Sequence, residues 1–124
     1  MRNGEKIWYC NRISLDNAET VEYSKPVEER LRHANVFNPI SITVQPKNGF
    51  TDRYVYGETI SKEQRIILTP YRYWADKFKE GDKFYLDGAK PSDEELFYGE
   101  FANYQVDSVA KQSEGIELSV KKII

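Results

Sequence analysis

From Ala102 to Val120 the sequence reads ANYQVDSVAKQSEGIELSV. Apolar and polar side chains alternate in residues 102–109, and they alternate again in residues 116–120. A period of two places successive side chains on opposite faces of a β-strand, so both segments predict strands. Residues 111–115, between them, have the length and the glycine typical of a hairpin loop. The stretch therefore predicts an antiparallel β-hairpin.

Similar short β-rich segments, bounded by Gly, Pro, Asn or Asp, recur through the rest of the chain. They predict strands at residues 6–13, 20–23, 36–44, 53–56, 65–69 and 83–86, with a turn at 16–18. Ile40 to Val44 alternates strictly, and Pro39 and Pro46 bracket it, which predicts an edge strand or one that starts at its proline. The continuous apolar run at 65–69 has the length of a buried strand.

Two segments favour helix. Residues 26–32 follow Ser24, a possible cap, and carry acids early and bases late, which suits the helix dipole. They hold few apolar residues, so an extended conformation remains open. Residues 71–78 place Trp74 and Phe78 four positions apart, as on one helix face. We therefore expect a mainly β protein, a small single-domain β-barrel or sandwich of about six to eight short antiparallel strands with one or two short helices, over residues 1–124 without a linker.

Composition excludes several classes of protein. The 124 residues carry 18 Lys+Arg and 20 Asp+Glu, a net charge of -2, which argues against binding nucleic acid by neutralising phosphates. No apolar run approaches the ~18 residues that span a bilayer, and no signal-peptide core follows Met1. A single cysteine cannot form an internal disulfide, and one cysteine with one histidine cannot make up a common zinc site. We expect no metal, cofactor, membrane or small-molecule substrate.

The chain offers little for catalysis. His33 has no nucleophile motif to serve, and Cys10 lies in a strand-like run, where a small buried side chain is the simpler interpretation. Acidic pairs occur at 28–29 and 93–95, but glycoside hydrolysis needs buried carboxylates at a defined separation, and adjacent acids are typical of solvated segments. We predict no catalytic residue and no enzyme.

Aromatic side chains suggest one alternative, the binding of single-stranded nucleic acid. Nine tyrosines, six phenylalanines and two tryptophans are present. A stacking set with neighbouring arginines would be Tyr54, Tyr56, Tyr71, Tyr73 and Trp74 with Arg53, Arg65 and Arg72. Any chain with 14% aromatics needs them for its core and interfaces, and Asp52, Glu58, Glu63 and Asp76 oppose a positive field.

Several stretches together resemble a known family. They are IWYCNR at 7–12, EYSKP at 22–26, YG at 56–57, FKEGDKFYLDG at 78–88 and GEFANYQVDSV at 99–109. Their order and spacing are similar to those of the head-closure, or stopper, proteins of long-tailed (siphovirus-type) bacteriophages and prophages of Gram-positive bacteria. Other small phage neck and tail-completion proteins share this size and β-rich style.

The resemblance implies a structural protein of the virion neck, made in the cytoplasm of the bacterial host. Such proteins dock as a ring below the portal and its adaptor, close the DNA channel and join the tail. The implied partners are further copies of the chain, the portal and adaptor proteins and the tail-terminator protein, while double-stranded DNA passes without sequence recognition. An inserted loop forms the plug in this family; the candidate here, with an ordinary surface hairpin as the alternative, is Lys47, Asn48, Gly49, Phe50, Thr51 and Asp52.

Overall fold

The computed structural model describes residues 3–13, 22–46 and 63–124, and it contains the predicted hairpin. Strand β8 covers Tyr104–Lys111 and β9 covers Ile116–Lys122. Every second side chain of β9 is buried up to Val120, as the alternation requires. A register shift between Val106 and Ser108 marks a bulge in β8, and no side chain of β8 beyond it is buried. The outer half of β8 therefore turns its side chains outward, whereas Ile116 and Leu118, on the part of β9 that pairs with it, stay in the core.

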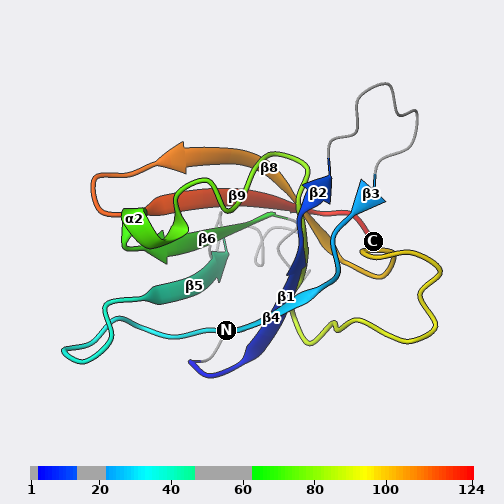
Figure 1. Ribbon diagram of the computed structural model, residues 1–124, viewed down its shortest axis with the longest axis horizontal. Helices are drawn as coiled ribbons and strands as arrows, with labels where there is room; N and C mark the ends of the chain where they lie inside the picture. The colour runs from blue at the N-terminus through cyan, green and yellow to red at the C-terminus, as the bar shows by residue number, and fades with distance from the viewer. Residues whose placement is uncertain (1–2, 14–21, 47–62) are drawn as a thin grey trace, which may run out of the picture.

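Seven strands form one antiparallel sheet in the order β4-β1-β7-β8-β9-β6-β5 (Figure 1). The remaining strands of this sheet are β1 Lys6–Cys10, β4 Val27–Arg30, β5 Ser41–Pro46, β6 Glu63–Thr69 and β7 Lys83–Tyr85. The two outermost strands, β4 and β5, approach each other where the segment after β4 meets β5. There Arg32 and Ile42 exchange two backbone hydrogen bonds of 3.0 and 2.9 Å. The sheet is thus nearly closed into a barrel, which confirms the predicted fold class.

A second, two-stranded sheet pairs β2 Arg12–Ile13 with β3 Glu22–Tyr23. The predicted strand at 6–13 is interrupted at Asn11, whose side chain donates to the buried carboxylate of Asp82 at 3.0 Å. Asp82 also accepts the backbone N–H groups of Arg12 and Lys79, at 2.7 and 2.8 Å. These three donors satisfy a carboxylate that has no exposed surface, which is the condition for burying it.

The barrel interior is filled by side chains from all parts of the sheet. Fully or almost fully buried apolar residues of this core are Ile7, Leu31, Ile42, Val44, Ile66, Leu68, Trp74, Phe78, Phe84, Leu86, Tyr104, Val106, Ile116, Leu118 and Val120. Within β6 the burial alternates rather than running through the strand: Ile66 and Leu68 face inward while Ile67 is half-buried. The apolar run at 65–69 is therefore a one-sided barrel strand.

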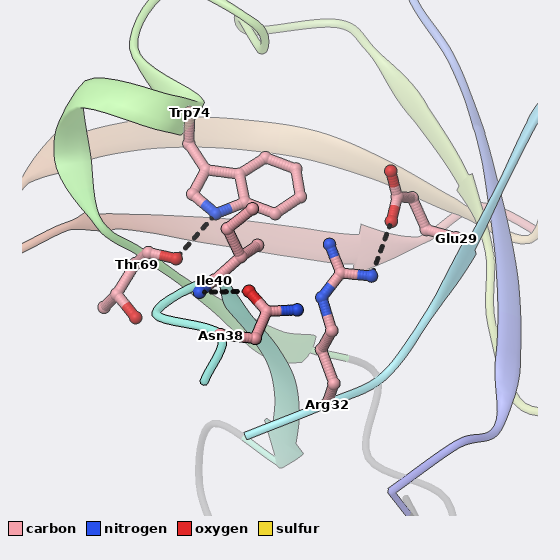
Figure 2. A network of polar contacts seen from close by, with 6 residues as sticks. All are labelled: Glu29, Arg32, Asn38, Ile40, Thr69 and Trp74. Atoms are coloured by element: carbon pink, nitrogen blue, oxygen red, sulfur yellow. Dashed lines mark hydrogen bonds and ion pairs between the residues drawn. The ribbon is translucent and has the colours of Figure 1, made fainter. Parts of the chain in front are cut away.

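The short helix α2, Tyr71–Trp74, lies between β6 and β7. Trp74 is completely buried, and its indole N–H donates to the Thr69 carbonyl oxygen at 2.9 Å (Figure 2). Its ring stacks on Phe78 with centroids 6.1 Å apart. The helix predicted over residues 71–78 is confirmed for its first turn only, and Phe78 lies beyond its end.

The structure corrects two predicted elements, the helix at 26–32 and the start of the strand at 36–44. Residues 27–30 form strand β4, not a helix, because they pair with β1 over the register Lys6↔Arg30 to Tyr9↔Val27. Pairing to a neighbouring strand outweighs a charge pattern worth only tenths of a kcal/mol, roughly, per group. The strand predicted from Val36 begins at Ser41, since residues 33–40 form a loop. The extended alternative for 26–32 was the better one.

The prediction of an edge strand between two prolines is confirmed. Strand β5 lies at the end of the sheet order. The turn at 16–18 and the strand at 53–56 lie outside the described residues. In the described part of the chain no helix is both long and apolar enough to cross a membrane.

Candidate functional site

The candidate plug segment, Lys47 to Asp52, lies outside the described residues, so its role stays a prediction.

Cys10 is completely buried, and burial raises the pKa of its thiol to about 11. A thiol with that pKa is almost entirely protonated near neutral pH, and therefore a poor nucleophile. His33 is exposed, as expected for a lone histidine in a polar segment.

Three of the five acidic residues singled out from the sequence, Glu28, Glu29 and Glu95, serve as structural partners. Glu28 pairs with Lys6 at 3.1 Å and Glu29 with Arg32 at 3.7 Å (Figure 2). Glu95 accepts a hydrogen bond of 2.9 Å from the Tyr85 hydroxyl. Among residues 3–13, 22–46 and 63–124, no group of three His, Cys, Asp or Glu side chains could hold a metal ion.

Among the members of the predicted stacking set that the structure describes, Trp74 is not available to stack on a base. Trp74 is completely buried and has no ring face to offer a base. The ammonium group of Lys111 lies 4.5 Å from the centroid of the Tyr71 ring, and that of Lys77 lies 3.9 Å from the Tyr73 ring. Each ammonium group thus occupies one face of its tyrosine ring in a cation–π contact. Tyr54, Tyr56 and Arg53 fall outside the described residues.

The most unusual surface feature is the 33–40 loop, which joins β4 to β5. Val36 is 95% exposed and Phe37 is 96% exposed, so two apolar side chains stand in water at its turn. The amide oxygen of Asn35 accepts the backbone N–H groups of Phe37 and Asn38, both at 2.8 Å. The Asn35 N–H in turn donates to the Asn38 carbonyl oxygen at 2.8 Å.

At the base of this loop, the Asn38 side-chain oxygen accepts the Ile40 N–H at 3.0 Å (Figure 2). Asparagine side chains that bind backbone groups two or three residues onward form tight, well-defined turns. The hydrogen bonds of Asn35 and Asn38 define the turn of the 33–40 loop, while Ile40 packs against the core.

A second exposed apolar group lies in the 87–103 loop, which joins β7 to β8. Leu96 is 88% exposed, and Phe97 and Tyr98 are also more than half exposed, with Phe101 partly so. The backbone between them is turned by hydrogen bonds from Glu95 N to Ser92 O and from Glu100 N to Phe97 O, at 3.1 and 3.2 Å. This loop also orients apolar side chains toward solvent.

Contacts with the barrel hold the 87–103 loop in place. The Asn103 amide makes two hydrogen bonds to the backbone of buried Leu86, of 2.8 and 2.7 Å. The hydroxyl of Tyr104 donates to the Asp87 carboxylate at 3.0 Å and accepts from Gln64 at 2.8 Å. Burial raises the pKa of Tyr104 to about 12, and the Asp87 carboxylate adds to the rise.

The two loops lie at opposite ends of the molecule. Figure 1 shows the 33–40 loop in cyan at the lower left and the 87–103 loop in yellow and orange at the right. They also differ in charge. Residues 30–40 contain two arginines and no acid, whereas residues 87–103 contain five acids, Asp87, Asp93, Glu94, Glu95 and Glu100, against Lys90 alone.

Sequence reasoning missed both apolar groups. Val36 and Phe37 were assigned to a strand, although Asn35 and the Asn38–Pro39 pair are turn residues that indicate a loop. In the other loop the acids at 93–95 indicate a solvated segment, and the three consecutive apolar residues that follow them give no signal of exposure in the sequence. Comparison with protein families, with characterised proteins and with solved structures finds no match to this chain.

Proposed function

We propose that this chain is a structural protein of the neck of a long-tailed bacteriophage or prophage. In this role it docks as a ring below the portal and adaptor, closes the DNA channel and joins the tail. The sequence stretches quoted above support the family. The observation that carries the role is the placement of two exposed apolar loops at opposite ends of one small barrel.

A subunit in the middle of a stacked assembly must contact neighbours on more than one surface. Aromatic side chains are enriched in the cores of protein interfaces, and Phe37, Phe97 and Tyr98 supply them here. Loops that are already ordered lose little conformational entropy on binding, which favours association. The hydrogen bonds of Asn35 and Asn103 provide that order before any partner arrives.

The direct test is electron microscopy of lysates from a phage that lacks this gene. We expect separate tails beside heads that have lost their DNA, and rescue when purified protein is added. Filled, stable heads without tails would move the protein to the tail side of the neck. Normal virions would overturn both structural roles, and a salt-dependent shift of a labelled oligonucleotide would then test the strand-binding alternative.

Complementation of the same phage can address the loops. Phe37→Ser and Leu96→Ser should each reduce the yield of joined virions, while Val109→Ser, an exposed apolar site on β8, should not. Deletion of residues 47–52 tests the plug separately. It should leave the purified protein folded but reduce DNA retention, and stable filled heads would show that this segment is not the plug.

A further inference from the structure

The two exposed loops suit each other in two properties that favour protein association: both expose apolar side chains, and they carry opposite charges. Val36 and Phe37 are almost fully exposed on the 33–40 loop, and Leu96 and Phe97 are exposed on the 87–103 loop. Burying such side chains against each other removes apolar area from water, which is favourable whatever the exact geometry. One chain therefore carries two exposed apolar groups that could be buried against each other.

Charge supports the same pairing. Arg30 is exposed and Arg32 is half-buried beside the 33–40 loop, whereas Asp93 and Glu94 are exposed next to Leu96. Arg32 pairs with Glu29 at 3.7 Å, with side chains 32% and 17% exposed, so the exposed Arg30 is the more accessible positive charge of the two. Opposite charges around an apolar centre favour one partner and one orientation over others.

The position of the loops sets the kind of contact. Because they lie at opposite ends of the molecule, the two loops of one chain do not meet (Figure 1). A contact between them joins the 33–40 loop of one copy to the 87–103 loop of another. Such a heterologous contact leaves one free loop of each kind, so it can repeat from copy to copy.

We propose that the occupant of the 87–103 loop is the 33–40 loop of a second copy of this chain, with Phe37 seated against Leu96 and Phe97. This inference deepens the proposed function and rests on it, since it names the surfaces through which ring subunits would meet. A second copy is favoured over an unrelated protein because both complementary surfaces occur on the same chain. The contact itself can be tested without any phage component.

The test is disulfide trapping with two single variants of the full chain, Phe37→Cys and Phe97→Cys. The natural Cys10 is buried and stays out of the reaction. After mixing at high concentration and mild oxidation, we expect the mixed dimer to exceed both homodimers. The yield should be about tenfold above that of a Phe37→Cys and Val109→Cys mixture, a ratio that corresponds to a modest preference in binding free energy.

Charge reversal provides a second measurement on the same pair. Arg30→Glu in the Phe37→Cys chain should reduce the mixed dimer, because Arg30 is exposed and takes no part in the barrel closure, and added salt should reduce it in the parent pair. A mixed dimer no more abundant than the Val109→Cys control would overturn the inference, as would a dominant Phe37→Cys homodimer. Loss of trapping together with normal rescue of the gene-deficient phage would leave the neck role intact and reject only this contact.

Discussion

The 33–40 loop and the 87–103 loop both hold apolar side chains in water, but they are built in different ways. Asn35 and Asn38 close the first loop with hydrogen bonds to residues at most three positions away. The second loop depends on Asn103, whose partner Leu86 is 17 positions away, and on Tyr104, which bonds to Gln64 across 40 positions. One loop is organised locally and the other by the barrel.

This difference separates two sources of order. Local Asx-type hydrogen bonds can form whenever the chain visits the turn, and solvent competes with them at the surface. The partners of the 87–103 loop are buried, where an unmade hydrogen bond is costly. We therefore expect damage to the second loop to lower the free energy of unfolding, and damage to the first to change only local dynamics.

The largest expected effect is from Tyr104→Ala. The side chain is completely buried and anchors the 87–103 loop through its hydroxyl, so its removal should lower the free energy of unfolding by about 3–5 kcal/mol, as for other emptied aromatic sites. Urea denaturation would measure the loss. Phe84→Ala, equally buried but without a loop contact of this kind, should cost a similar amount. A loss of under about 1 kcal/mol for either would contradict its place in the core.

Raising the pH should lower the free energy of unfolding through buried groups of the barrel. Burial raises the pKa of Cys10 from 9.0 to about 11 and that of Tyr104 from 10.0 to about 12. For each group, at a pH between its unfolded and its folded pKa, the folded protein holds a proton that the unfolded chain has released. The stabilisation from these two groups is therefore fully present below pH 9 and is lost as the pH rises toward 12. The loss should reach about 1–3 kcal/mol per group. Tyr104→Phe should remove the share of Tyr104 above pH 10, while Cys10 and Tyr85, whose pKa values burial also raises, keep theirs; an unchanged profile would contradict this origin.

Asn103→Ala should cost about 1–3 kcal/mol, because the N–H and carbonyl groups of buried Leu86 both lose their partner. Hydrogen exchange at the Leu86 amide should accelerate with it. If water can enter and replace the amide, stability will stay close to that of the parent protein, and the anchoring role assigned to Asn103 will be wrong.

The matched substitution in the other loop, Asn35→Ala, should lower stability by less than about 1 kcal/mol, since its hydrogen bonds are exposed to solvent. Amide exchange at Phe37 and Asn38 should nevertheless become faster. Asn35→Asp keeps the accepting oxygen and should preserve the slow exchange. A stability loss equal to that of Asn103→Ala would remove the distinction between the two loops.

Much of the fold was accessible from the sequence because its signals are local. The alternation at 102–109 and 116–120 predicted the hairpin, and the apolar run at 65–69 predicted a strand. The burial of Cys10 was also predicted, from its strand-like neighbours. The candidate site was not, because exposure of Val36 and Phe37 depends on where the strand stops, and an apolar pair in the sequence is equally compatible with a strand or a loop.

Local alternation, turn residues and composition thus established a small antiparallel β protein, since each strand's two faces are written into its own residues. Tertiary structure alone decided that 27–30 is a strand, because only pairing with β1 could outweigh a helix-like charge pattern. It also decided the near-closure of the barrel at Arg32 and Ile42, and the separation of the two apolar loops to opposite ends. Those features depend on which segments meet in space, and no single segment carries that information.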